Sequence, residues 1–191
     1  MTYPKIWFLR HGQTVWNAER RIQGQFESDL TDTGIGHART QARLLQPILP
    51  VAEAFHVSPL RRAQQTARIA LGDLPYTVDP RLAEAHAGDW QGLLRDDVLR
   101  QWPERTRPDM SALELFLSAP GGERLDAFRG RITAFLSELS APSVIVAHGL
   151  WGQAMRAHVL GLGWDDMLSL SNDQACVYVL EDGQETVLRA A

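Results

Sequence analysis

The sequence is poor in cysteine and lysine: Cys176 and Lys5 are the only residues of their kinds in 191 positions. A single cysteine excludes an internal disulfide and any metal site built from cysteines alone, and it favours a reducing, cytoplasmic setting. No apolar run approaches the roughly 18 residues that a membrane-spanning helix needs, and the first residues lack the pattern of a secretory signal. We therefore expect no membrane association.

An excess of positive charge is also missing, because the net charge is −4. This balance argues against a general nucleic-acid-binding function. All but one of the 19 basic residues are arginines, and arginine carries a planar fork of donors that matches phosphate. Hydrophobic residues make up 45% of the chain, and neither a repeat nor a linker interrupts it, so we expect one globular domain over residues 1–191.

Short apolar runs alternate with amphipathic segments along the chain. The patterns predict strands at 5–9, 54–57, 143–147, 175–180 and 186–189, and helices at 31–49, 60–71, 125–139 and 150–160. Asp182-Gly183 between the last two strands is a hairpin signal. This alternation predicts an α/β fold with a largely parallel sheet, helices on both of its faces and an antiparallel C-terminal edge.

Three of the predicted strands run directly into polar motifs. These motifs are Arg10-His11-Gly12, Ser58-Pro59-Leu60-Arg61-Arg62 and His148-Gly149. In open α/β sheets, ligands bind beyond the carboxyl ends of the strands. If the three strands are parallel, two histidines and at least two arginines therefore meet at one edge. Two cations and two imidazoles describe a site for a dianion, and phosphate is the common biological choice.

The same motifs carry a resemblance to a known family. R-H-G-Q-T-V-W-N from Arg10 resembles the defining motif of the histidine phosphatase superfamily, in its phosphoglycerate-mutase-like branch. Further blocks follow in family order: L-T-D-T-G from Leu30, S-P-L-R-R-A-Q-Q-T-A from Ser58, L-A-E-A-H-A-G-D-W-Q-G from Leu82, P-G-G-E from Pro120 and V-A-H-G from Val146. The resemblance covers residues 5 to about 180 and implies a three-layer α/β/α sandwich.

The resemblance also implies a catalytic pair. His11 corresponds to the family nucleophile, which forms a phosphohistidine, and a neutral imidazole is nucleophilic near pH 7 without a metal. Glu84 stands where the family carries its general acid, which then serves as base toward the hydrolytic water. His86, two residues further on, is a second candidate for facing this pocket.

A set of binding residues follows from the same correspondence. Phosphoryl transfer requires charge stabilisation around three equatorial oxygens. Residues matching the family's phosphate-binding positions are Arg10, Asn17, Gln23, Gly24, Arg62, His148 and Gly149. Arg62 rather than Arg61 is the family arginine, because it directly precedes the alanine of the motif. We expect no cofactor, and no metal, because no H-x-H motif or carboxylate cluster is present.

Residues 93–120 are expected to form a lid of one or two short helices whose arginines are mostly solvated. Phosphoglycerate mutases of this branch carry a longer insertion here, with paired arginines and a proline run that this chain lacks. A shorter lid leaves a phosphohistidine open to water and favours a phosphatase. Glu123 matches a family position near the pocket rim, although Arg124 stands where the family often has serine.

The physiological substrate is left open by the sequence. Relatives of this length include α-ribazole phosphatases, broad-specificity phosphomonoesterases and sugar-phosphate phosphatases, so the partner is expected to be a small phosphate ester. A phosphoglycerate mutase and a catalytically idle phosphate-binding protein are the alternatives. The oligomeric state is also open, a homodimer included.

Overall fold

The computed structural model describes residues 3–190, in which a central sheet of six strands is the main element. The strands are β1 (Ile6–Arg10), β2 (Ala54–Val57), β3 (Thr77–Val78), β4 (Ser143–Ala147), β5 (Cys176–Glu181) and β6 (Gln184–Arg189). Their order in the sheet is β3-β2-β4-β1-β5-β6. The first four of these positions pair in parallel, whereas β5 and β6 are antiparallel to their neighbours. The predicted parallel sheet with an antiparallel edge is therefore confirmed.

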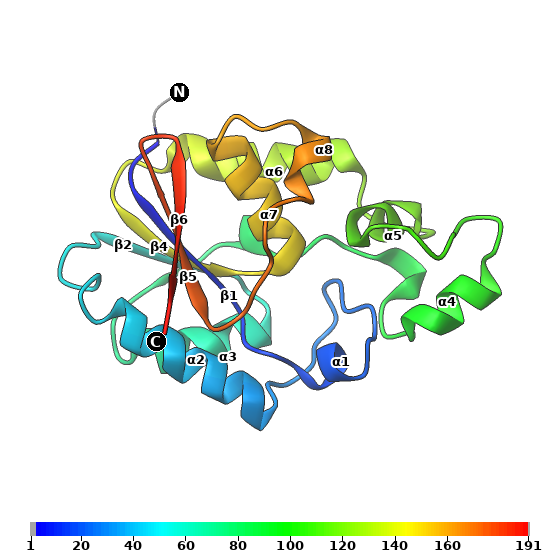
Figure 1. Cartoon of the computed structure of the whole chain (residues 1–191), viewed down its shortest axis with the longest axis horizontal. Coiled ribbons are helices and arrows are strands. Elements are labelled where there is room, and N and C mark those ends of the chain that lie inside the picture. Colours follow the sequence, from blue (N-terminus) through cyan, green and yellow to red (C-terminus); the bar gives the residue numbers. More distant parts are fainter. Residues whose placement is uncertain (1–2, 191) are drawn as a thin grey trace.

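Helices cover both faces of this sheet. They are α1 (Val15–Ala18), α2 (Asp32–Leu45), α3 (Arg61–Leu71), α4 (Arg95–Gln101), α5 (Ala112–Ser118), α6 (Leu125–Glu138), α7 (Gly149–Val159) and α8 (Trp164–Met167), with short 3-10 turns η1 (Pro80–Leu82) and η2 (Gly88–Trp90). In Figure 1, α2 and α3 lie below the sheet and α6 and α7 lie above it. The segment with α4 and α5 extends to one side, beyond the ends of the strands.

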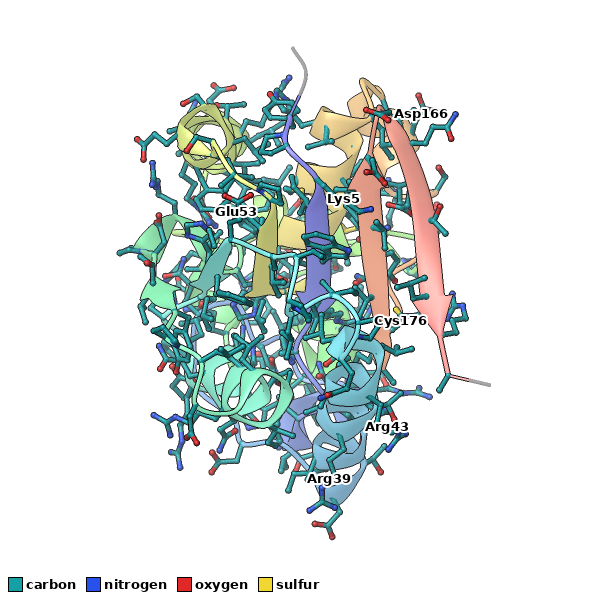
Figure 2. All side chains as sticks on the ribbon, turned by 90° about the vertical axis from the view of Figure 1, so that its left-hand side faces the viewer. Lys5, Arg39, Arg43, Glu53, Asp166 and Cys176 are labelled. Carbon is teal, nitrogen blue, oxygen red and sulfur yellow. The ribbon has the colours of Figure 1, made fainter. Side chains whose placement is uncertain are left out.

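The strands are apolar on both faces, as a sheet covered twice requires. In β1, Ile6 and Phe8 pack with the helices α6 and α7, whereas Trp7 and Leu9 pack with α2 and α3. A separate apolar cluster around Trp90 supports α4 and α5. Figure 2 shows the strands side by side, with Lys5 at the start of β1 and Cys176 on β5.

The differences from the predicted elements are local. The strands at 54–57 and 143–147 have the expected bounds, but the helix expected over 31–49 ends at Leu45 and continues as turns to Val51. The edge strand β3 was not predicted, because two exposed residues give no alternation of apolar and polar positions. No helix between residues 3 and 190 is long and apolar enough to cross a membrane.

Candidate active site

Strand register brings the three motifs to one edge of the sheet. β4 lies between β1 and β2, and Arg10 pairs with Ala147 while Val57 pairs with Val146. The pairing continues one residue past the strands, since the backbone N of His11 donates to the Ala147 carbonyl at 3.0 Å. The residues that follow these strands must therefore lie next to one another.

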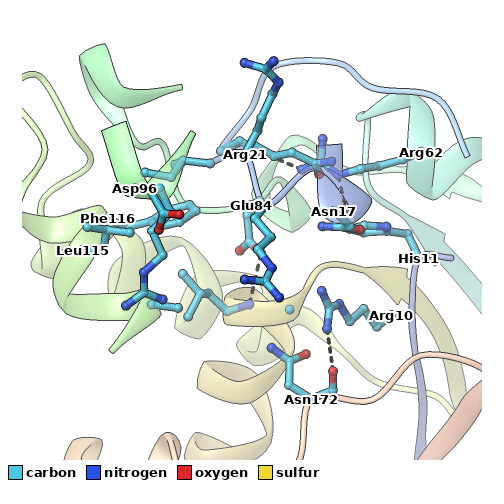
Figure 3. Close-up of a pocket in the computed structure, with 18 of the residues that line it drawn as sticks. Arg10, His11, Asn17, Arg21, Arg62, Glu84, Asp96, Leu115, Phe116 and Asn172 are labelled. Atoms are coloured by element: carbon cyan, nitrogen blue, oxygen red, sulfur yellow. Dashed lines mark hydrogen bonds between the residues drawn. The ribbon is translucent and has the colours of Figure 1, made fainter. Parts of the chain in front are cut away.

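A cavity of about 590 Å³ opens at this edge, between the strand ends and the segment that carries α4 and α5 (Figure 3). The expected site residues that line it are Arg10, His11, Asn17, Gln23, Gly24, Arg62, Glu84 and Gly149. His148 is not among the lining residues and is fully buried, with its ring centroid 5.2 Å from that of His11. The structure thus gathers the whole expected set around one cavity.

His11 is held in one tautomer by its own backbone. Its Nδ1 lies 2.7 Å from the carbonyl oxygen of Gly12, which only accepts, so Nδ1 must carry the proton. The lone pair is therefore on Nε2. Burial, with smaller contributions from Arg62 and Arg10, holds the pKa of His11 well below its usual range. His11 is consequently a neutral imidazole at physiological pH.

Arg62 is buried beside the histidine, at the first turn of α3. Its Nε donates to Nε2 of His11 at 3.3 Å, and its two terminal nitrogens donate to the carbonyls of Gly24 and Phe26. Burial lowers the pKa of Arg62 to about 10, so the guanidinium stays charged at neutral pH. Gly24 adopts a positive φ of 54°, and a Cβ there would lie 2.2 Å from Oε1 of Gln91. This backbone conformation, in which the Gly24 carbonyl accepts from Arg62, therefore requires a glycine.

His148 depends on Ser58, a residue that the sequence motif contained without an assigned role. The Ser58 hydroxyl lies 2.6 Å from Nε2 of His148 and accepts a bond from the backbone N of Leu60. Nδ1 of His148 is buried and has no partner among the described residues. If the hydroxyl donates to Nε2, the proton of the neutral ring is on Nδ1, as a donor beside His11. Burial and the nearby Arg62 lower the pKa of His148 well below its usual range.

Arg10 and Asn17 are positioned by a loop that sequence reasoning missed. Arg10 donates to the carbonyl of Asn172, and Nε2 of Gln174 donates to the carbonyl of His11 and weakly to Oδ1 of Asn17. This loop precedes β5, and β5 is antiparallel to β1. The amino end of β5 therefore lies at the same edge of the sheet as the carboxyl ends of the parallel strands. The expected antiparallel edge brings this loop to the site, but no motif in residues 172–174 marks them as site residues.

Glu84 is anchored at the N-terminus of α7. Its carboxylate accepts hydrogen bonds from the backbone N of Ala85, Leu150 and Trp151, at 2.9 to 3.0 Å. Only 7% of the residue is exposed, and it lines the cavity that His11 and Arg62 also line (Figure 3). Partial positive charge at a helix N-terminus suits a carboxylate at this position.

Three other expected residues have side chains that bind other parts of the protein. His86 does not line the cavity: its Nδ1 accepts from the backbone N of Gly88, and its other nitrogen contacts Gln91. Glu123 is also absent from the lining and binds Arg131 of α6 through both carboxylate oxygens. Gln23 lines the cavity but donates to the hydroxyl of Thr14.

The segment expected as a lid contains two short helices, α4 and α5. Its arginines differ in environment. Arg100 and Arg107 are exposed and pair with acidic neighbours, as expected, whereas Arg95 lines the cavity and donates to the carbonyl of Met110. Within residues 3–190, no three histidine, cysteine or acidic side chains lie close enough together to hold a metal ion.

Comparison with known proteins agrees with this geometry. Residues 6–189 match the family model of the "Histidine phosphatase superfamily (branch 1)". A glucosyl-3-phosphoglycerate phosphatase from Mycolicibacterium vanbaalenii is 37% identical over 185 residues, covering 87% of this chain and 78% of that protein. A 2,3-bisphosphoglycerate-dependent phosphoglycerate mutase from Beijerinckia indica is 32% identical, covering 81% and 78%. The alpha-ribazole phosphatase structure from Shigella flexneri superposes with a TM-score of 0.80 at 27% identity, covering 97% and 96%.

The chain belongs to the histidine phosphatase superfamily, branch 1. Its fold and its phosphatase relatives identify it as a phosphomonoesterase.

The buried histidines predict how stability depends on pH. The unfolded chain binds a proton at each histidine near pH 6.5, whereas folded His11 does not, because its pKa is lowered. The unfolded state therefore binds more protons, and stability is lost as the pH falls below 6.5. Urea titrations at pH 7.5 and 5.5 should show that His11→Asn loses about 1 kcal/mol less than the wild type over this interval. Equal losses would show that the pKa of His11 is the same in the folded and the unfolded protein.

Proposed function

We propose that this phosphomonoesterase acts through a phosphohistidine formed on Nε2 of His11. The observation that supports this most strongly is the bond from Nδ1 of His11 to Gly12, which leaves the Nε2 lone pair beside Arg62. Phosphate oxygens are better acceptors for a guanidinium than an imidazole nitrogen is. A bound phosphate would therefore take the Arg62 donor and release the lone pair for attack on phosphorus.

The remaining donors around His11 suit the transferring phosphoryl group. Arg10 has a buried Nε without a partner among the described residues, and so does Nδ1 of His148. Oδ1 of Asn17 accepts from the backbone N of Thr14, and within residues 3–190 its Nδ2 makes no hydrogen bond. Together with Arg62, these groups can donate to three equatorial oxygens, where charge develops in the transition state. Arginine side chains keep their proton at neutral pH, so Arg10 and Arg62 can balance a phosphate dianion without a metal.

Glu84 completes the reaction. In the first step the P–O bond to the leaving group breaks as the N–P bond forms, and the leaving oxygen takes the proton of the Glu84 carboxyl. In the second step the Glu84 carboxylate accepts a proton from water, whose oxygen attacks phosphorus and breaks the N–P bond. Glu84 and His11 line the same cavity. A general acid and a nucleophile that act on one phosphate ester must do so.

The outer part of the cavity indicates the class of leaving group. Its apolar wall comes mainly from the segment with α4 and α5, with Leu99, Pro108, Leu115 and Phe116. Its charged lining contains three arginines, Arg20, Arg21 and Arg95, against a single acid, Asp96. Arg21 and Arg95 bind other groups of the protein, whereas no bond joins the exposed Arg20 side chain to another residue within 3–190. This surplus of cations suits a leaving group with a negative charge.

The surplus of positive charge favours a substrate like that of the glucosyl-3-phosphoglycerate phosphatase over one like that of the alpha-ribazole phosphatase. We propose an organic phosphate ester of the glucosyl-3-phosphoglycerate kind, in which a carboxylate can meet Arg20 and a sugar can contact the apolar wall. An α-ribazole phosphate could use the apolar wall but would leave the arginines without an anion.

The single, buried Cys176 is in keeping with the reducing, cytoplasmic setting expected from the sequence.

The role of Glu84 predicts a dependence on the leaving group. An alkyl ester must expel a poor alkoxide, so Glu84→Gln should lower its kcat/KM by about 10²–10⁴. A nitrophenyl ester expels a stable phenolate, so its kcat/KM should fall far less. The variant should also release a burst of nitrophenol before slow turnover, because the phosphohistidine lacks its base. Equal losses for both esters, with no burst, would contradict the assignment.

The proposed substrate class predicts a preference between two esters that differ at one group. 3-Phosphoglycerate carries a carboxylate where glycerol 3-phosphate carries a hydroxymethyl group. Arg20→Gln should lower the preference for 3-phosphoglycerate, as a ratio of kcat/KM values, by about tenfold, since a charge-assisted hydrogen bond contributes about 1.5–3 kcal/mol. Arg61→Gln is the matched control, because Arg61 is exposed and pairs with Asp29 outside the cavity.

Two results would count against this assignment. An unchanged preference in Arg20→Gln would exclude Arg20 as the anion-binding group. Formation of 2-phosphoglycerate instead of free phosphate, with 2,3-bisphosphoglycerate present, would favour the mutase reaction.

A further inference from the structure

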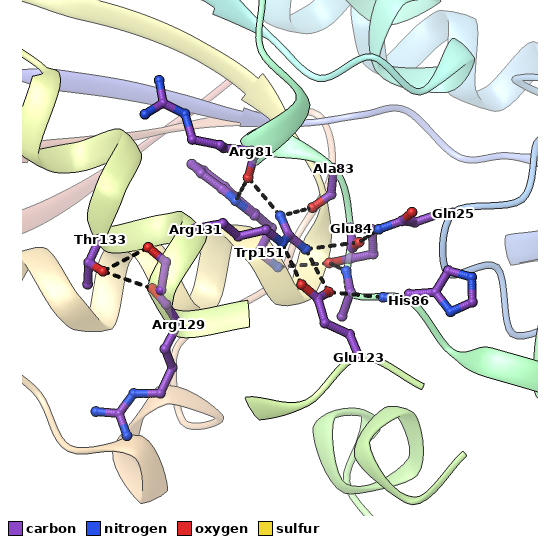
Figure 4. A network of polar contacts seen from close by, with 12 residues as sticks. Gln25, Arg81, Ala83, Glu84, His86, Glu123, Arg129, Arg131, Thr133 and Trp151 are labelled. Carbon is purple, nitrogen blue, oxygen red and sulfur yellow. Dashed lines mark hydrogen bonds and ion pairs between the residues drawn. The ribbon is translucent and has the colours of Figure 1, made fainter. Parts of the chain in front are cut away.

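Behind Glu84, on the side away from the cavity, lies a polar network centred on Arg131 of α6 (Figure 4). The Arg131 guanidinium donates to the carbonyls of Arg81, Ala83 and Glu84, at distances of 2.5 to 3.1 Å. One side chain therefore binds three of the four carbonyls in the segment that leads to the general acid. This segment contains no long helix or strand that could hold it by itself.

Glu123 completes the network. Its carboxylate accepts from Nε and Nη2 of Arg131 at 2.7 and 3.0 Å, and it also accepts from the backbone N of His86 at 3.2 Å. The backbone N of Glu123 donates in turn to the His86 carbonyl at 2.8 Å. The pair is little exposed, at 17% and 14% of the two side chains. Arg131 and Glu123 thus bind the backbone on both sides of Glu84.

Proton transfer by Glu84 requires its carboxyl to lie within hydrogen-bond distance of the leaving oxygen. The tip of Glu84 is bound by the backbone N of Leu150 and Trp151 in α7, and its backbone is bound by Arg131. The position of the carboxyl therefore depends on both anchors, of which Arg131 supplies the second. An arginine presents its donors in a rigid plane, and a lysine has no such fork. Three carbonyls and a carboxylate bound by one guanidinium fix that backbone in a way that packing alone does not.

We propose that Arg131 and Glu123 are positioning residues for proton transfer by Glu84. This inference rests on the proposed role of Glu84 as general acid. Neither residue lines the cavity, so neither is expected to touch the substrate. Their loss should therefore leave phosphate binding intact and displace only the proton donor. The Arg131 guanidinium also lies over the Phe128 ring, 4.8 Å from its centroid, whereas Ile132, Phe135 and Leu136 pack α6 into the core.

The test measures sensitivity to the leaving group. For each protein we would determine kcat/KM with an alkyl phosphate and with nitrophenyl phosphate, and take the ratio. Arg131→Lys should lower this alkyl-to-nitrophenyl ratio by about 10- to 100-fold, because a displacement near 1 Å can cost about 10²-fold in rate. Inhibition by inorganic phosphate should be unchanged. Glu123→Gln should shift the ratio in the same direction, which keeps the test decisive if Arg131→Lys fails to fold.

Arg156→Lys is the matched control. Arg156 of α7 is more deeply buried than Arg131, with 1% against 17% of the side chain exposed, and it is similarly bound. It donates to the carboxylate of Glu185 and to the carbonyls of Gly152 and Ser171. It makes no contact with the segment around Glu84. This variant should lose stability in thermal unfolding without changing the alkyl-to-nitrophenyl ratio.

The possible failures are distinguishable. If Glu84→Gln lowers the ratio but Arg131→Lys and Glu123→Gln both leave it at the wild-type value, the positioning role is wrong and the general acid stands. If Arg131→Lys lowers both esters equally, or if Arg156→Lys lowers the ratio as much, the residue is structural only. If Glu84→Gln itself leaves the ratio unchanged, the proposed function is wrong, and the positioning role fails with it.

Discussion

β4 pairs in parallel with β1 on one side and β2 on the other, and this register decides where the candidate active site lies. Each strand is followed at once by a polar residue, so His11, Ser58 and His148 form one row across the sheet edge. The strands are apolar on both faces and the residues that follow them are polar, so sliding a strand along its neighbours would draw these polar groups into the core. The core thus holds the site in place.

The site itself departs from rules that the rest of the fold obeys. α3 begins with two arginines, although a helix N-terminus disfavours cations, and its cap is the carboxylate of Glu27, which accepts from the backbone N of Arg61. Arg62 is nevertheless buried there, because Gly24, Phe26 and His11 accept its hydrogen bonds. Local conflicts of this kind are expected at functional sites. In the proposed mechanism this buried charge is already arranged for phosphate and need not be reorganised when charge develops.

Much of this arrangement could be predicted from the sequence, because it follows from short-range patterns. Buried strands such as Ser143–Ala147 are continuous apolar runs, and the polar residues that follow them are visible in the sequence. What could not be predicted depends on contacts between distant segments. Asn172 and Gln174 reach the site because β5 is antiparallel, and Arg131 of α6 donates to the carbonyl of Glu84, 47 residues away in the chain. Neither position has a local signal.

The site of phosphorylation tests the central claim most directly, since the backbone bond of His11 leaves Nε2 as its only nucleophilic nitrogen. Enzyme mixed with a labelled phosphate ester would be quenched in alkali, which preserves phosphohistidine, and the labelled peptide would be examined by phosphorus NMR. We predict phosphorus on Nε2 of His11 and no label in His11→Ala. Phosphorus on Nδ1, on another residue, or in a form that survives acid would contradict the account.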